Sequence, residues 1–270
     1  SRASPCSRVE PVEVASTQIA AWVGAFLWPF ARIGGMLAVA PVFGARIMPM
    51  RVRLMFALVL TWVVQPFIQA LPGVDPLSPA GALVVLHQLL VGVAMGFVLQ
   101  LAFAALMFGG QVLAMSMGLG FAAMVDPQNG IQVPMIGQYY LILAILLFFA
   151  ADGHLLLIQL VAGSFLTLPL DAASLSADTL WYLASWGAVV FSGGLLIALP
   201  AATAVLITNL AFGVATRLAP QLNIFAVGFP VAMLVGFGAM MLTLPELLPR
   251  IGQLLEQSFD HLRTLSVASP

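Results

Sequence analysis

The chain has 270 residues, of which 62% are hydrophobic and only 7% are charged. A soluble domain carries roughly a quarter charged residues, so this composition excludes an ordinary soluble globular protein and predicts a membrane-embedded one. The formal net charge of -1 provides no basic field of the kind that attracts nucleic acid, and we expect no nucleic-acid partner.

The N-terminal part of the chain alternates between polar and apolar stretches. Residues 1–18 are polar and are expected to form a tail. Apolar blocks follow at residues 19–45 and 54–71, and a loop rich in proline and glycine, residues 71–81, ends the second block. Two helical segments are therefore predicted before the middle of the chain.

Longer runs without any charged residue make up the rest of the chain. A spanning helix needs about 20 apolar residues, and these runs are too long and too uniform for strands, which would alternate with a period of two. The sequence therefore predicts an all-α membrane protein with about six apolar helical segments. The uncharged runs extend from Asp75 to Asp126, from Asp126 to Asp152, from Asp178 to Arg217 and from Arg217 to Glu246.

Prolines, amides and glycines inside these blocks modify the simple picture of independent spans. Proline kinks a helix, and amide groups in lipid need partners. Both features favour helices that face protein over a large part of their surface, although ordinary kinked transmembrane helices also fit. The spacing Gly92-xxx-Gly96 favours close helix packing. The interrupting prolines are Pro29, Pro66, Pro200 and Pro230.

Arg32 lies inside the first apolar block. An arginine at mid-bilayer costs about 2.5–3.5 kcal/mol on insertion scales. Two interpretations remain open: Arg32 pairs with a carboxylate or with backbone carbonyls, in this chain or in a partner, or its side chain extends to a membrane interface.

The sequence Asp152-Gly153-His154 brings an acid close to an imidazole. It fits a turn between two apolar helices, or a buried proton-responsive pair. No hydrolase, zinc-protease or phosphate-binding motif accompanies it. The one cysteine and three widely separated histidines supply too few neighbouring ligands for a typical zinc site, so no catalytic residue, metal or cofactor is expected.

Two further stretches stand out by composition. Residues 109–130 are rich in glycine and methionine and carry no charge before Asp126; the residues alone favour a kinked core helix packed through these side chains. Near residue 217, a proline ends a helix and amides can bond freed backbone groups. This is a helix-hairpin corner with Arg217 beside it, which could also dock a partner. The corner residues are Pro220, Gln221 and Asn223.

Four motifs together resemble the FliR family, the flagellar biosynthesis proteins of the type III export gate. They occur in the family's order and extend over about residues 19–260. Their Asp-Pro-Gln and Asp-Gly-His details resemble the flagellar branch more than the virulence injectisome branch. The motifs are FARIGGMLAVAPVFGARIMP (30–49), MSMGLGFAAMVDPQNG (115–130), FFAADGHLLLIQLVAGSF (148–165) and NLAFGVATRLAPQLNIFAVGFPV (209–231).

The resemblance implies a fold and an assembly. Residues 19–178 would resemble a P-type export subunit, residues 179–265 would resemble a Q-type helical hairpin, and residues 266–270 would form a C-terminal tail. Several copies of the P-type and Q-type subunits would join this chain in the bacterial inner membrane at the flagellar basal body. Further partners would be the flagellar export switch membrane protein, the large export-apparatus ring protein, lipid and unfolded flagellar export substrates.

The resemblance also implies a role for the glycine- and methionine-rich stretch, as a plug loop of about residues 106–126 that seals the closed pore. Methionine adapts to irregular partners, glycine bends, and an apolar constriction excludes ions by dewetting. The competing functions are a self-contained transporter of a small solute, for which no inverted repeat is evident, and an intramembrane enzyme. The expected plug residues are Gly109, Gly110, Met115, Met117, Gly118, Leu119, Gly120, Phe121 and Met124.

Overall fold

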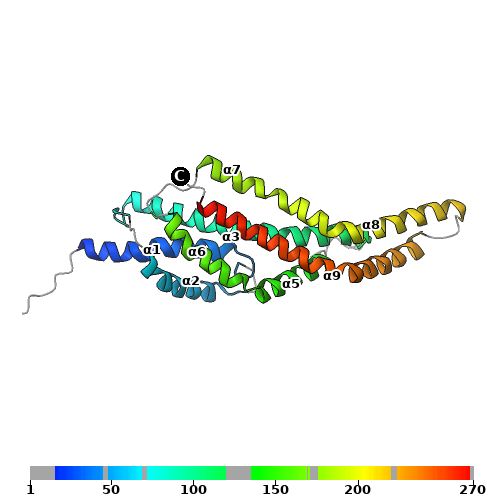
Figure 1. Cartoon of the computed structure of the whole chain (residues 1–270), viewed down its shortest axis with the longest axis horizontal. Helices are drawn as coiled ribbons and strands as arrows, with labels where there is room; N and C mark the ends of the chain where they lie inside the picture. The colour runs from blue at the N-terminus through cyan, green and yellow to red at the C-terminus, as the bar shows by residue number, and fades with distance from the viewer. Residues whose placement is uncertain are drawn as a thin grey trace, which may run out of the picture.

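The computed structural model describes residues 16–44, 48–68, 72–119, 135–168, 170, 176–219 and 224–267. Every regular element within these residues is a helix. The helices lie roughly along one long axis and form an elongated bundle (Figure 1). The expectation of an all-α fold is confirmed.

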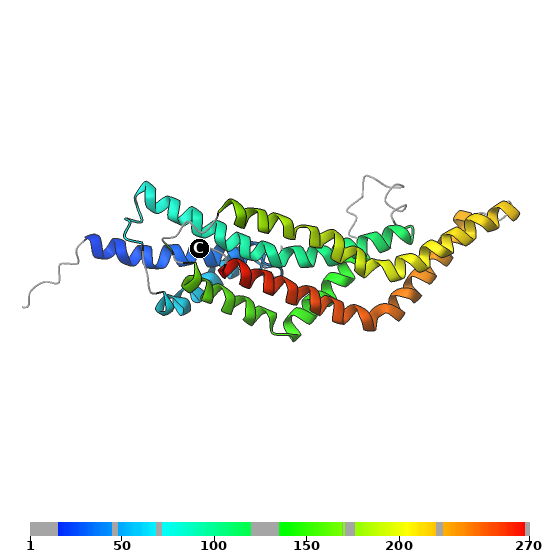
Figure 2. The same ribbon diagram turned by 45° about the horizontal axis from the view of Figure 1, so that its top comes forward.

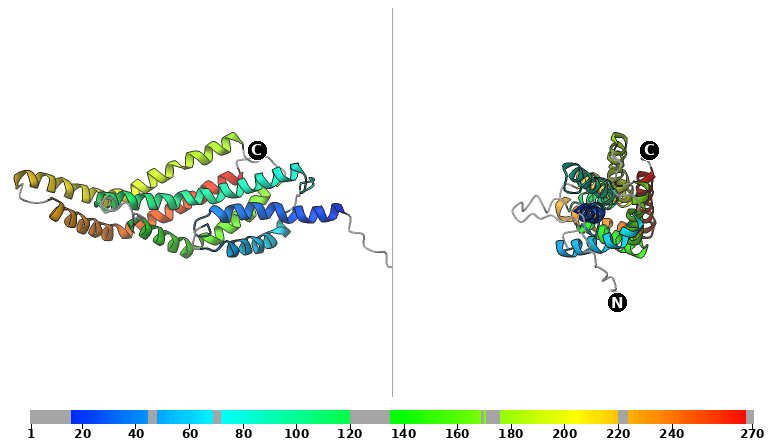
Figure 3. Two further views of the ribbon diagram at one scale, coloured as in Figure 1. Left: turned by 180° about the vertical axis from the view of Figure 1, so that it is seen from behind. Right: turned by 90° about the vertical axis from the view of Figure 1, so that its left-hand side faces the viewer.

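Helix α3 (Pro79–Ser116) is the centre of the bundle. Its start is defined by Ser78, whose hydroxyl accepts a hydrogen bond from the Gly81 backbone N–H at 3.1 Å, and by a proline in the first turn, where the missing N–H is tolerated. Helix α1 (Ser16–Val39) packs along one side of α3, and α8 (Ala188–Leu218) along another (Figure 3). Sixteen positions of α3 are buried.

Glycines allow these helices to approach one another closely. A Cβ atom at Gly92 would overlap the Arg32 carbonyl of α1, and one at Gly96 would lie 2.6 Å from the Met36 carbonyl oxygen. Gly35 on α1 faces the Leu89 carbonyl of α3 in the same way. The predicted glycine packing motif therefore forms the crossing of α1 and α3.

Helix α2 (Met50–Val64) is short and lies against α1. Only Ala57, Thr61 and Val64 are buried in it, and its 15 residues are too few to span a bilayer. The 3-10 helix η1 (Gln65–Phe67) extends it through Pro66.

Helices α5 (Met135–Ala150) and α6 (Gly153–Thr167) form a bent pair with an angle of 67° between them. Phe148, near the end of α5, is fully buried between two other helices. Its ring contacts Phe103 of α3 edge-on with centroids 5.9 Å apart, and stacks on Phe259 of α9 at 6.4 Å. This aromatic contact joins the bent pair to the bundle.

Helices α7 (Ala177–Trp186), α8 and α9 (Ile224–Val267) form a long hairpin. Near the C-terminus, the His261 ring of α9 stacks between Tyr182 and Trp186 of α7, with centroid distances of 3.8 and 4.4 Å. At the other end, α8 and α9 extend beyond the remaining helices as an arm (Figure 2). We call residues 201–218 and 224–244 the arm.

Four runs are long and apolar enough to cross a membrane, at residues 22–39, 79–116, 177–218 and 227–265, and the bent pair of α5 and α6 could form a fifth. About half of each of the first two windows is buried inside the chain, against 33% and 17% of the last two. The hairpin therefore leaves most of its apolar surface without cover from this chain.

Candidate functional site

Arg32 has no exposed surface, and its side chain lies between α1, α3 and the end of α6. Its Nε donates a hydrogen bond to Oε1 of Gln88 at 2.7 Å. Its Nη1 donates to the carbonyl and hydroxyl oxygens of Ser164 at 2.9 and 3.1 Å, and its Nη2 donates to the Leu168 carbonyl at 2.8 Å. The guanidinium also lies 4.3 Å from the centre of the Phe165 ring, within the range of a cation–π contact.

The position of these acceptors explains why a charge is tolerated there. The last carbonyls of a helix lack donors within the helix and carry its negative dipole end. Arg32 supplies donors to this end of α6, and Gln88 extends the network by donating from Nε2 to the Leu170 carbonyl at 3.2 Å. Of the two interpretations left open, Arg32 therefore follows the first, with neutral acceptors in place of a carboxylate.

Asp152 and His154 form a turn and not a mutual pair in the described structure. Asp152 is exposed, adopts a left-handed conformation with φ of 53°, and begins α6. Gly153, the next residue, is buried, and a Cβ added there would lie 2.5 Å from the Phe148 ring. The His154 ring instead lies 5.1 Å from the Phe149 ring. The turn between two apolar helices is the arrangement that these residues adopt.

Gly109 and Gly110 lie inside α3, so residues 106–116 of the expected plug loop are helical. A Cβ at Gly109 would lie 2.6 Å from the Gly194 carbonyl oxygen of α8, and one at Gly110 would overlap Gly137 of α5. Both glycines therefore serve as points of helix contact, whereas the family resemblance implied that they bend within a plug loop. The alternative of a helix packed through glycine describes them.

The end of α3 is held by the hairpin. The Met117 side chain is buried and fills the space above Gly236 of α9. Gly118 has φ of 81°, which an L-residue adopts only with strain, and the Phe229 ring occupies the position of its absent Cβ. Leu119 packs against the core, whereas Met115 remains 63% exposed. Asn209 of α8 donates from Nδ2 to the Ser116 carbonyl at 3.2 Å.

The remaining predicted residues fall into two groups. Arg217 is exposed in the last turn of α8, where a cation is favoured by the helix dipole. The others lie outside the described residues: Gly120, Phe121 and Met124 of the expected plug, Asp126, which was expected as a buried or partner-docking charge, and Pro220, Gln221 and Asn223 of the hairpin corner.

Sequence reasoning missed Arg250 of α9. Its Nη1 donates a hydrogen bond to the Leu196 carbonyl of α8 at 2.8 Å. The signal was Pro200, four residues after Leu196, because proline leaves that carbonyl without its helical donor. Among the described residues, no group of three or more His, Cys, Asp or Glu side chains could hold a metal ion.

These observations define a class: an all-α membrane protein with closely packed, glycine-lined helices, a buried arginine cap and a long apolar arm. Comparison with known proteins makes this specific. The family model of the bacterial export proteins, family 1, matches residues 23–258. The chain belongs to this family and is a membrane protein of flagellar biosynthesis and protein export.

Individual relatives agree over nearly the whole chain. A flagellar biosynthetic protein FliR of Pectobacterium carotovorum subsp. carotovorum is 41% identical over 89% of this chain and 92% of its own length. The protein of that name in Escherichia coli K12 is 36% identical over 93% of this chain and 96% of its own length. The protein of that name in Bacillus subtilis 168 is 29% identical over 79% of this chain and 83% of its own length.

Proposed function

We propose that this chain is a core, non-enzymatic subunit of the flagellar type III protein export gate. Together with P-type and Q-type subunits it forms the pore through which unfolded flagellar substrates cross the bacterial inner membrane. The flagellar export switch membrane protein and the large export-apparatus ring protein are its further neighbours in the basal body. Family membership supports the export role, and the geometry of the long helices supports the assembly.

The observation that carries the assembly is the length of apolar helix α3. Its 38 residues extend about 57 Å at roughly 1.5 Å per residue, nearly twice the roughly 30 Å of a bilayer core. Fitting all of it into lipid would need a tilt of about 60°, beyond the usual 0–40°. Part of this apolar surface, and of the even longer α9, therefore needs cover from protein, as a multi-subunit gate would provide.

The same proposal assigns parts of the chain. Residues 19–178 act as the P-like part and residues 179–265 as the Q-like hairpin, a division supported by the way α7, α8 and α9 form one hairpin beside the other helices (Figure 1). The plug begins where α3 ends, at Met117, rather than at residue 106, because the helix continues to Ser116. Contacts of Met117 and Gly118 with α9 anchor the base of this plug.

A stalled export substrate tests the pore and the plug together. A photo-crosslinking amino acid placed at Met115, which is 63% exposed at the end of α3, should capture a substrate whose folded fusion domain blocks its passage. The matched control is the same crosslinking amino acid at Trp62, which is 75% exposed on α2. At this position it should capture no stalled substrate. Capture from Trp62 but not from Met115, in cells that still secrete, would refute the assignment.

The plug itself has a separate test. Replacing residues 117–124 by a flexible polar linker of equal length should make cells that contain the assembled gate leaky to small solutes, because the apolar seal is lost. Met50→Ser is the control, since it changes an exposed methionine at the start of α2, outside the plug region. Unchanged permeability in the linker variant, with the complex intact, would count against the plug.

A further inference from the structure

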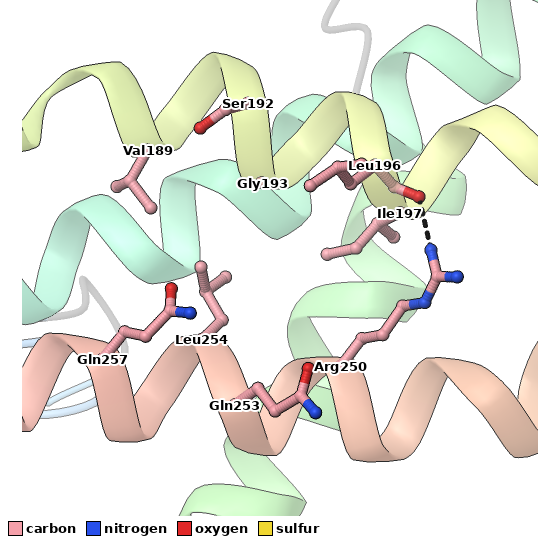
Figure 4. A pocket seen from close by; sticks show the side chains of 9 residues that line it. All are labelled: Val189, Ser192, Gly193, Leu196, Ile197, Arg250, Gln253, Leu254 and Gln257. Carbon is pink, nitrogen blue, oxygen red and sulfur yellow. Dashed lines mark hydrogen bonds between the residues drawn. The ribbon is translucent and has the colours of Figure 1, made fainter.

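Helix α8 contains a proline, Pro200, in its interior. Proline has no backbone N–H, so the carbonyl four residues earlier loses its helical hydrogen bond. That carbonyl belongs to Leu196, and it accepts a hydrogen bond from Nη1 of Arg250 at 2.8 Å (Figure 4). Arg250 comes from the opposite helix of the hairpin, and its guanidinium replaces the missing donor.

The packing around this bond is loose on one side. A groove of about 320 Å³ lies between α8 and α9, and Ser192, Gly193, Gln253 and Gln257 line it together with Leu196 and Arg250 (Figure 4). Arg250 reaches from α9 to the Leu196 carbonyl at one end of this groove. Val189, Ile197 and Leu254 also line this groove and are buried. The Arg250 bond therefore adds a hydrogen-bonded contact to the apolar packing of α8 and α9, at the level of the Pro200 bend.

The chain is fixed before the bend. A Cβ at Gly194 would lie 2.5 Å from the Ala105 carbonyl oxygen, so this part of α8 contacts α3 backbone to backbone. Helix α9 carries its own prolines, Pro245 and Pro249, immediately before Arg250. Both helices change direction where the arm begins (Figure 2). Each helix of the hairpin is thus weakened by proline in the region of the Arg250 bond.

We propose that Pro200, the Leu196 carbonyl and Arg250 form a hinge clamp that sets the direction of the arm. With the Arg250 bond made, the bend at Pro200 has one preferred angle; with the bond broken, the arm moves over a wider range. The clamp can open, because the Arg250 side chain is 41% exposed and Glu246, whose carboxylate oxygen lies 3.9 Å from Nη2, offers a competing acceptor.

The hinge angle bears on the end of α3. Beyond the bend, α8 still holds the Ser116 carbonyl through Asn209, and α9 covers Met117 and Gly118. Movement of the arm therefore changes the contacts at the last turn of α3. The clamp is a property of the fold that stands whether or not the export proposal is correct.

Distances between two spin labels measure the clamp directly. The labels are attached to cysteines introduced at two exposed positions, Leu218→Cys on the arm and Leu83→Cys near the start of α3. The measurement uses the full chain with its co-purified partners, and Cys6→Ser removes the native cysteine so that it is not labelled. Arg250→Met removes the donor and keeps the stem. We expect it to shift and broaden the distance distribution, and Arg250→Lys, which keeps a donor, to retain the parent distribution more closely.

The decisive comparison uses Pro200→Ala, which returns a helical donor to the Leu196 carbonyl. In that background Arg250→Met should leave the distribution unchanged, a result that general loss of stability would not give. Glu246→Gln controls for the ion pair and Arg263→Met for loss of a positive charge elsewhere on α9; neither should reproduce the effect. Equal shifts with and without Pro200, or no shift from Arg250→Met in either background, would overturn the proposal.

Discussion

Arg32 shows at the scale of one residue how the fold accommodates a charge in an apolar bundle. A buried guanidinium is costly unless its donors are satisfied. Here it bonds the Gln88 amide, the Ser164 carbonyl and hydroxyl, and the Leu168 carbonyl. The Ser164 carbonyl also accepts from the Leu168 backbone N–H within the helix, whereas the Leu168 carbonyl lies just past the last turn of α6, where helical donors end. The residue therefore acts as a C-terminal cap for α6 and connects it to α1 and α3.

Removing this cap should destabilise the chain strongly. Arg32→Met removes the guanidinium donor from the Leu168 carbonyl and the Gln88 amide oxygen, at a cost of about 1–3 kcal/mol for each buried acceptor. Thermal unfolding of the chain in detergent, together with its co-purified partner subunits, measures the loss. Arg51→Met is the matched control, because Arg51 is exposed on α2 and surface changes stay within about 0.5 kcal/mol. Equal melting temperatures for the two variants would disprove the capping role.

The sequence could predict that Arg32 needs a partner but could not identify it. The acceptors come from positions 56 and more than 130 residues away, and no local pattern encodes such a distance. Arg250 was missed for the same reason: Pro200 indicated a carbonyl in need of a donor, while the donor belongs to another helix.

At the scale of elements, helix contact depends on which glycines face a neighbour. Gly34 and Gly35 are adjacent in α1 and chemically identical, yet a Cβ at Gly34 meets nothing within 4 Å, whereas one at Gly35 would lie 2.6 Å from the Leu89 carbonyl oxygen. Composition alone cannot distinguish these two glycines, but the neighbours that each one faces in the structure distinguish them.

Alanine substitutions at these two glycines should act in opposite directions. Gly34→Ala should stabilise the chain by up to about 1 kcal/mol, because alanine favours helix over glycine. Gly35→Ala should destabilise it, because backbone would have to move to admit the methyl group. The shift in unfolding temperature gives the sign of each. Destabilisation by both substitutions, or by neither, would show that the crossing of α1 and α3 is not as described.

The extent of the elements was only partly predictable. Hydropathy located the apolar blocks because burial in lipid or protein requires them, and the Gly92-xxx-Gly96 spacing correctly indicated a close crossing. The sequence could not show that α3 continues through Gly109 and Gly110 to Ser116. The tight contacts of these two glycines with α8 and α5 depend on neighbours that the local sequence does not specify. The plug assignment stays a prediction.

At the scale of the whole molecule, the arm presents large apolar side chains on a structure too long for one bilayer. Leu210, Leu218, Leu234, Met241 and Leu242 are each more than 60% exposed. Exposed apolar surface of this extent marks an interface or a lipid contact. Hydropathy predicted the apolar character, whereas the arrangement as a projecting arm required the structure.

A charge on the arm should separate assembly from folding. Leu242→Glu places a carboxylate on α9, where Leu242 is 83% exposed, and burial of that unpaired charge against a partner is costly. We expect the chain to accumulate in the membrane but to lose co-purification with export subunits. The control Leu77→Glu changes a residue that is 87% exposed in the loop before α3, and this variant should still co-purify with the export subunits. Undiminished co-purification of the Leu242 variant would exclude the arm from the interface.

We propose that this chain works only as part of a gate built from several kinds of subunit. The most direct measurement is native mass spectrometry of the tagged chain purified in mild detergent, with and without co-expressed P-type and Q-type subunits. We expect one defined hetero-oligomer when the subunits are present and aggregation when the chain is made alone. A stable monomer or homo-oligomer that ignores those subunits would contradict it and favour a self-contained transporter.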